Sequence, residues 1–181
     1  MQPVFLTLLL FSLSIVSVSA IEIKADKLKV SSGKIRFTSR APKLEFYGVG
    51  KEIEGEVDLK SKSVQLKIKL GSFRTGMKLR DEHMRENYLE TSKFPEAVFI
   101  GKIKAFDQKS GDAEVEGTLN LHGVEKQNIR IRGNVSSKDN GFLLKAEFPI
   151  LLKDFQIQIP RLVFLELNNE IKIEAELELT E

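Results

Sequence analysis

The stretch "EIEGEVDLKSKSVQLKIKLG", residues 52–71, alternates between apolar and polar or charged side chains at nearly every step. Its first half places Ile53, Gly55 and Val57 on one face and acidic residues on the other. After the turn-forming "KSKS", the second half resumes the same alternation. A strand with one dry and one solvated face produces this period of two. The stretch therefore predicts a β-hairpin.

The same alternation recurs along most of the chain. Further runs cover residues 98–106, 113–121, 129–135, 142–150 and 171–179. Turn-forming sequences such as "QKSGD" and "KDNG" separate them, and only residues 78–90 read as a helix. Antiparallel strands with one dry face and no helical layer form either a two-sheet sandwich or a closed barrel. We predict an all-β fold, an antiparallel barrel of about eight strands with one short helix at about 78–90.

Composition restricts the classes of function. The 181 residues suit one domain, and 28 basic against 26 acidic residues give a net charge of +2. The charges alternate in sign along the predicted strands and form no long basic stripe, so we expect no nucleic-acid partner. The chain has no cysteine, which excludes disulfides, cysteine metal sites, cysteine nucleophiles and a lipid-modified N-terminal cysteine.

The first twenty residues form a separate segment. They carry no ionised side chain and end with the small residues Val18, Ser19 and Ala20. This pattern predicts a secretory signal peptide cleaved near Ala20, which leaves a barrel domain at 21–181 in the periplasm or outside the cell. No Lys or Arg precedes the apolar core, so a retained membrane anchor is the alternative.

Small residues recur near the middle of the dry strand faces. Glycine weakens a strand, so its repeated use needs a reason. One reason is an empty interior that takes a hydrocarbon; the alternative is that the glycines only allow the strands to bend or bulge. On the first interpretation the lining of the lipid cavity comprises Ile53, Gly55, Val57, Leu66, Ile68, Phe99, Gly101, Ile103, Val115, Gly117, Leu119, Ile131, Gly133, Leu144, Ala146, Phe148, Ile173, Ala175 and Leu177.

Energetics set the size of a ligand held by hydrocarbon alone. Burial of a methylene contributes about 0.8 kcal/mol, and association costs on the order of 4–15 kcal/mol. Micromolar binding needs about 8 kcal/mol net. An occupant of about fifteen to thirty carbons satisfies this balance, which favours long acyl or isoprenoid chains over small metabolites.

The charged run at 78–90 is the other candidate site. Met77, just before this run, and Met84, Tyr88 and Leu89 within it form a potential inward edge of a short helix. Arg80, Asp81 and His83 are candidate head-group contacts or structural polar groups. Asp81 and His83 also suggest acid–base or metal chemistry, but no third convergent group or second ligating histidine accompanies them. We therefore predict no catalytic residue, no metal and no cofactor other than a bound lipid.

Two blocks of sequence resemble a known family. "SFRTGMKLRDEHMRENYLETSKFPEAVF", residues 72–99, is similar to the signature segment of the YceI-like, polyisoprenoid-binding proteins. The matching residues are Thr75, Gly76, Arg80, Asp81, His83, Phe94, Pro95 and Phe99. "VEGTLNLHGVEKQNIRI", residues 115–131, resembles the family's hairpin through Gly117, Thr118, Leu119, His122 and Gly123.

One later element departs from the family pattern. "LLKDFQIQI", residues 151–159, has Lys153 where the family has arginine and Gln156 where it has glycine. The resemblance implies a bacterial, exported, lipocalin-like barrel that encloses a long amphiphile such as a polyisoprenoid or a fatty acid. It also implies that the helix with Arg80, Asp81 and His83 is largely a structural connector.

These observations predict a non-enzymatic protein that sequesters or transports a long-chain lipid. The alternatives are an enzyme that acts on a lipid through Asp81 and His83, and a structural or partner-binding barrel with a filled core. A transient contact with a membrane and a homodimer, paired through an edge strand or the segment 41–52, are further expectations.

Overall fold

The computed structural model describes residues 21, 23, 25–162 and 165–181, with the backbone alone described for 161, 162 and 165. The strands are β1 (Lys27–Ala41), β2 (Leu44–Gly50), β3 (Ile53–Asp58), β4 (Ser63–Lys69), β5 (Glu96–Phe106), β6 (Asp112–Leu121), β7 (Val124–Lys138), β8 (Gly141–Leu151), β9 (Arg161–Leu162), β10 (Leu165–Glu166) and β11 (Glu170–Thr180). The helical turns are η1 (Leu70–Ser72), α1 (Lys78–His83), η2 (Met84–Tyr88) and η3 (Leu152–Phe155).

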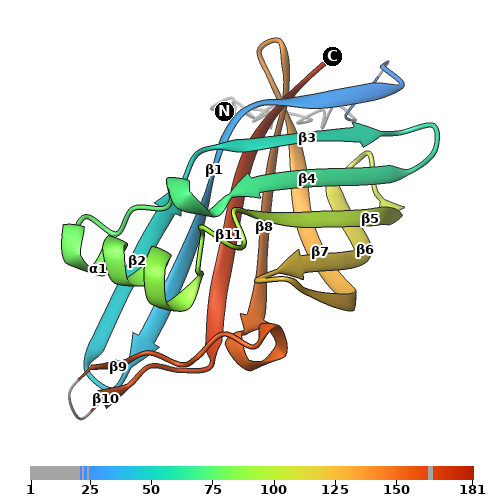
Figure 1. Ribbon diagram of the computed structural model, residues 1–181. Coiled ribbons are helices and arrows are strands. Elements are labelled where there is room, and N and C mark those ends of the chain that lie inside the picture. The colour runs from blue at the N-terminus through green and yellow to red at the C-terminus, as the bar shows by residue number, and fades with distance from the viewer. Residues whose placement is uncertain (1–20, 22, 24, 163–164) are drawn as a thin grey trace, which may run out of the picture.

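The main sheet closes on itself (Figure 1). Its strands lie in the order β11-β8-β7-β6-β5-β4-β3-β1, and β11 pairs again with β1. All of these pairings are antiparallel, and most join strands that follow each other along the chain. The structure therefore confirms the predicted antiparallel barrel of eight strands and rules out the sandwich.

Strand β1 divides its outer edge between two partners. Its beginning pairs with β3 through Lys27–Lys29, whereas its later part, from Ile35 to Ala41, pairs with β2. β2 has no other strand ladder in the described part of the chain; a single bridge joins Val49 to Arg74. Strand pairing thus closes one end of the barrel between β1 and β3, whereas at the other end β2 presents a free edge.

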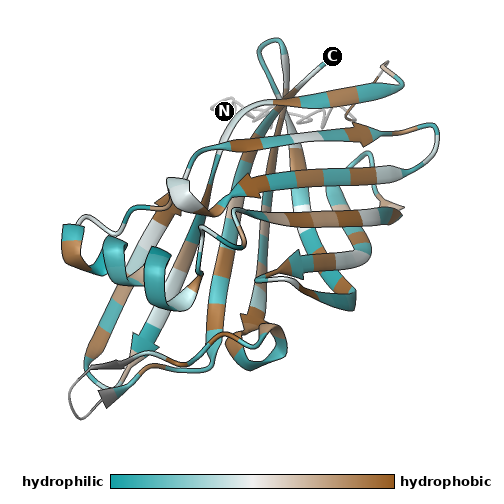
Figure 2. Ribbon diagram, in the orientation of Figure 1, coloured by the Kyte–Doolittle hydropathy of each residue, from teal (hydrophilic) through white to brown (hydrophobic). Residues whose placement is uncertain are grey.

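The hydropathy of the strands follows the predicted alternation. Apolar and polar bands alternate along them in Figure 2, and the inward residues form one hydrophobic core. On the outside, opposite charges face each other across neighbouring strands, as in the pair of Arg132 with Glu114 at 2.8 Å. Because opposite charges pair across the strands, the outer surface of a chain that is 30% charged carries no basic stripe.

The predicted helix is present, although it is not uniform. α1 ends at His83 and continues as the wider π-helical turn η2 to Tyr88. Together these turns lie beside β2 (Figure 1). The connection from β8 to β11, which contains η3 and the short β9–β10 ladder, lies toward the same end of the barrel.

Candidate functional site

The barrel encloses an apolar cavity of about 530 Å³. Its side chains come from one end of the strands, from the helical segment and from the connection before β11. They are Ile35, Phe37, Ser39, Phe46, Ile68, Leu70, Phe73, Met77, Leu79, Arg80, His83, Met84, Tyr88, Leu89, Ala97, Leu119, Leu121, Phe148, Ile150, Leu152, Ile157, Pro160, Leu167, Ile171 and Ile173. The volume lies within the range of about 300–1,000 Å³ that is usual for ligand pockets.

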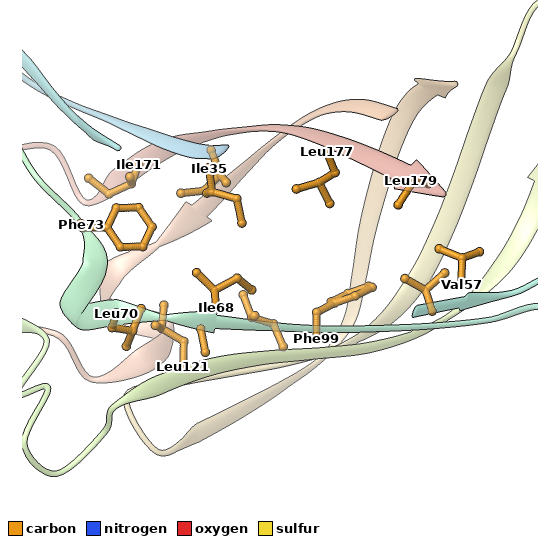
Figure 3. Close-up of a cluster of buried hydrophobic side chains, with 14 of the residues drawn as sticks. Ile35, Val57, Ile68, Leu70, Phe73, Phe99, Leu121, Ile171, Leu177 and Leu179 are labelled. Atoms are coloured by element: carbon orange, nitrogen blue, oxygen red, sulfur yellow. The ribbon is translucent and has the colours of Figure 1, made fainter. Parts of the chain in front are cut away.

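Strand direction explains why these residues meet. The end of β4 and the end of β6 lie next to the beginning of β5, because neighbouring strands are antiparallel. Leu121 at the end of β6 and Ile171 at the beginning of β11 therefore belong to the same end of the barrel, which we call the hollow half. Figure 3 shows Leu70, Phe73, Leu121 and Ile171 at this end, with their side chains directed into the interior.

The opposite end, which we call the packed half, is filled by its own side chains. Phe99 and Leu177 are 4% and 1% exposed, and Val57 and Leu179 lie beyond them in Figure 3. Leu28 is equally buried. These side chains occupy the interior at the level where the small mid-strand residues lie.

The mid-strand glycines correct one expectation from the sequence, because they do not open the cavity. A Cβ on Gly117 would lie 2.2 Å from the carbonyl oxygen of Ile100, and one on Gly133 would lie 2.6 Å from that of Lys145. Real Cβ atoms do not approach so closely, so these glycines allow neighbouring backbones to come near. The β6–β7 register also shifts just after Gly117, which agrees with the alternative of bending and bulging.

The structure therefore divides the nineteen residues that were predicted to line a cavity. Those that line it are Ile68, Leu119, Phe148 and Ile173. Those that do not line it are Ile53, Gly55, Val57, Leu66, Phe99, Gly101, Ile103, Val115, Gly117, Ile131, Gly133, Leu144, Ala146, Ala175 and Leu177. Some of the wall residues that were missed are the next members of the same dry faces, such as Leu70 after Ile68 and Ile150 after Phe148. The others come mainly from β1, β2 and the connection before β11.

The helical segment completes the cavity wall next to β2. Met77, Met84, Tyr88 and Leu89 all line the cavity, which confirms that they form an inward edge. Phe46 of β2 lines the cavity on the other side of the contact between β2 and the helical segment. Side-chain packing, rather than a ladder of hydrogen bonds, therefore closes the hollow half between β2 and the helical segment.

Asp81 has a structural role at the start of this segment. Its Oδ1 accepts hydrogen bonds from the Thr75 backbone N–H at 2.7 Å and from the Thr75 hydroxyl at 2.6 Å. Burial alone would raise the pKa of Asp81, but these bonds and the charges of Arg74 and Arg85 outweigh it and hold the pKa below its ordinary value. The carboxylate thus fixes the turn before α1 and does not line the cavity.

Arg80 and His83 lie at the mouth of the cavity. Both line it, and the Arg80 guanidinium lies 4.4 Å from the centroid of the Phe46 ring. Arg80 also donates a weak hydrogen bond to the Met77 sulfur at 3.7 Å. The three predicted polar residues therefore separate: Arg80 and His83 face the cavity, whereas Asp81 holds the backbone.

His122 connects the far end of the helical segment to the barrel. Its Nε2 lies 3.0 Å from a Glu90 carboxylate oxygen, and its Nδ1 lies 3.1 Å from the Phe155 carbonyl oxygen. Glu90, His122 and Gln156 all have left-handed backbones, with φ of 42°, 54° and 56°. Such conformations cost energy in non-glycine residues, so the surrounding contacts must impose them. The network fixes the position of the segment that carries Arg80.

The described residues contain neither a metal-binding cluster nor a membrane-spanning helix. They contain no group of three or more His, Cys, Asp or Glu side chains that could hold a metal ion. They also contain no helix that is long and apolar enough to cross a bilayer. The predicted signal peptide at residues 1–20 lies outside the described residues.

The fold and its cavity define a closed antiparallel β-barrel with an internal apolar pocket. The model of the YceI-like domain family matches residues 21–179, and the chain belongs to this family. No curated protein sequence matches the chain.

Several solved structures share the fold. BcnA of Burkholderia cenocepacia superposes with a TM-score of 0.70 at 17% identity, over 82% of this chain and 96% of that one. A polyisoprenoid-binding domain from Saccharophagus degradans, implicated in plant cell wall breakdown, gives 0.68 at 17% identity over 84% and 97%. The YCEI protein of Campylobacter jejuni gives 0.57 at 18% identity over 94% of both chains.

Proposed function

We propose that this protein is a non-enzymatic carrier that holds a long-chain amphiphilic lipid, of polyisoprenoid or fatty-acyl type, in the hollow half of the barrel. The cavity is the observation that carries the proposal. Its wall is almost wholly aliphatic and aromatic, and it has the volume of a ligand pocket. Membership of the YceI-like family and the shared fold with a polyisoprenoid-binding domain support this choice of ligand.

Two features argue against the two alternative functions. Asp81 does not line the cavity, and its Oδ1 already accepts two hydrogen bonds from Thr75. The interior is packed in one half only, so a filled core does not describe the whole barrel. Binding without chemistry is therefore the function that best uses the cavity.

The protein would work outside the cytoplasm and load from a membrane. The proposed export rests on the signal-peptide pattern that ends at Ala20. Met77 and Leu79 at the cavity mouth are 52% and 60% exposed, next to the basic residues Lys78 and Arg80. Apolar side chains interleaved with cations suit transient contact with an anionic bilayer surface.

The homodimer through an edge strand stays a prediction, which size-exclusion chromatography with light scattering would check.

The experiment is lipid extraction followed by probe binding. The full-length chain is expressed in a bacterial host, purified without detergent and extracted with organic solvent for mass spectrometry. We expect a co-purified prenyl or acyl lipid, and saturable uptake of a fluorescent fatty-acid probe by the delipidated protein. Absence of both would overturn the proposal.

Cavity-filling variants locate the site. Ala97 lines the cavity from β5, so Ala97→Phe should place a ring in the lipid position and abolish uptake. The matched control is Ala105→Phe, on the exposed face of the same strand. If Ala97→Phe fails to fold, Leu121→Trp fills the same space from β6. Normal uptake by a folded filling variant would place the ligand elsewhere.

A further inference from the structure

The mouth of the cavity contains a half-buried cation, the guanidinium of Arg80. Among the described residues no Asp or Glu oxygen lies within 4.0 Å of the Arg80 guanidinium. The nearest carboxylates along the chain are engaged elsewhere: Asp81 with Thr75, and Glu82 with Lys78 at 3.9 Å. A charge in this position benefits from an anion that the protein itself does not supply.

Other cations of the same region are already engaged. Arg74 donates to the carbonyl oxygens of Gly71 and Phe73 at 2.7 and 2.8 Å, so it holds the chain. Lys78 lies near Glu82 and is 91% exposed. Neither residue lines the cavity. Arg80 is thus the cation of this helix whose charge faces the apolar interior.

The contacts of Arg80 orient the guanidinium without consuming its hydrogen-bonding capacity. Its carbon lies over the face of Phe46, and one nitrogen approaches the Met77 sulfur. A guanidinium stacked on a ring keeps its N–H donors in its own plane, where they match a carboxylate or phosphate. The imidazole of His83 adds further donor capacity at the same mouth.

We infer that the lipid in this cavity carries an anionic head, a carboxylate or a phosphate, and that Arg80 with His83 forms its subsite. The inference rests on the proposed function, since the cavity must first hold the chain of the lipid. The apolar wall then takes the hydrocarbon, and the mouth selects the head. Neutral alcohols of the same length would lose the charge-assisted hydrogen bonds.

The test compares ligands that differ only at the head. Palmitate is paired with hexadecanol, and geranylgeranyl monophosphate with geranylgeraniol, each by displacement of a fluorescent probe from the delipidated full chain. We expect at least one anionic ligand to bind about tenfold more tightly than its alcohol. A preference within the first pair only indicates a carboxylate head, and one within the second pair only indicates a phosphate head.

Variants assign the preference to a residue. Arg80→Gln should bring the ratio of acid to alcohol affinity close to one, Arg80→Lys should restore part of it, and His83→Gln should reduce it less. Arg85→Gln is the control, because Arg85 is a cation of the same segment that does not line the cavity. Circular dichroism checks that each variant is folded.

The outcomes separate this inference from the proposed function. If the wild-type protein binds acids and alcohols equally well, or if the preference survives Arg80→Gln, the anionic subsite is wrong while the lipid carrier stands. If none of the four ligands binds, the carrier function falls together with the subsite.

Discussion

The half of the barrel around Gly117 and Leu177 differs from the half around Leu121 and Ile171, although the same strands build both. In the first, side chains and neighbouring backbones fill the interior, and an added Cβ on Gly117 has no room. In the second, large apolar residues surround an open space. Mid-strand glycines therefore mark places where neighbouring backbones of this barrel approach closely, and they do not mark its cavity.

The reason lies in what closes each end. Strand ladders close the packed half, including the short β1–β3 pairing, and glycines let the backbones approach. In the hollow half β2 pairs with β1 but not with β3, and the helical segment and the chain before β11 complete the wall. Side chains hold this wall at a distance, which leaves space for a ligand.

The largest contrast should come from one substitution made in each half. Leu177→Ala removes a side chain that is 1% exposed in the packed half, and should lower the free energy of unfolding by about 4 kcal/mol. Leu121→Ala borders existing space, so it loses fewer contacts and should cost about 2 kcal/mol. Urea denaturation of the delipidated proteins measures both. Equal losses would show that the halves are packed alike.

The next effect tests the glycines directly. Gly117→Ala adds a methyl group against the Ile100 carbonyl and should destabilise the fold by about 3 kcal/mol. Gly117→Phe would place a ring at the same crowded position and should prevent folding. Ala97→Val adds two methyl groups toward the cavity and should change stability by less than about 1 kcal/mol. A neutral Gly117→Ala would restore the view that glycine leaves space.

A smaller effect concerns the turn that positions the hollow half. Asp81→Asn keeps the shape but loses charge-assisted hydrogen bonds from Thr75, at a cost of about 2 kcal/mol at neutral pH. The folded pKa of Asp81 is lowered, so its contribution is present above the unfolded value of about 3.9 and is lost as pH falls through the folded value. The stability difference between the two proteins should therefore be constant above about pH 5 and shrink in acid. A gap that does not depend on pH would contradict this role.

The smallest expected effect is an increase in the free energy of unfolding. Gln156 has a left-handed backbone, φ 56°, at the position where the family resemblance places glycine. Gln156→Gly should relieve about 1–2 kcal/mol of strain but also makes the unfolded chain more flexible. We expect a net stabilisation of about 0.5 kcal/mol by urea denaturation, with lipid uptake unchanged. Destabilisation would mean that the Gln156 side chain makes a contact worth more than the strain.

The sequence predicted the barrel because alternation is local. Each run, such as 171–179, shows which residues face inward. The same alternation also allowed a two-sheet sandwich, which the pairing of β11 with β1 excludes. The inward edge of the helical segment, with Met84 and Tyr88, was also predictable. Gln156 in place of glycine was visible as a departure, and its left-handed backbone explains why glycine suits the position.

The location of the cavity was not predictable in the same way. Whether a part of the barrel interior is empty depends on distances between residues of different strands, such as the close approach of Gly117 to Ile100. Phe37 and Phe46 line the cavity from a region with no clear period, and Leu167 does so from a loop. Alternation shows whether a side chain points into the barrel, but not at which position along the barrel axis it lies.

The free edge of β2 has a consequence for exchange. Phe46 of β2 faces the helical segment. If β2 and the helical segment move apart, contacts such as the stacking of Arg80 on the Phe46 ring are lost, but no strand ladder breaks. A ligand would therefore enter and leave the cavity on the timescale of side-chain and helix motion. Backbone amides of β5 to β8 would meanwhile stay protected from deuterium, and rapid turnover of the occupant would coexist with a rigid barrel.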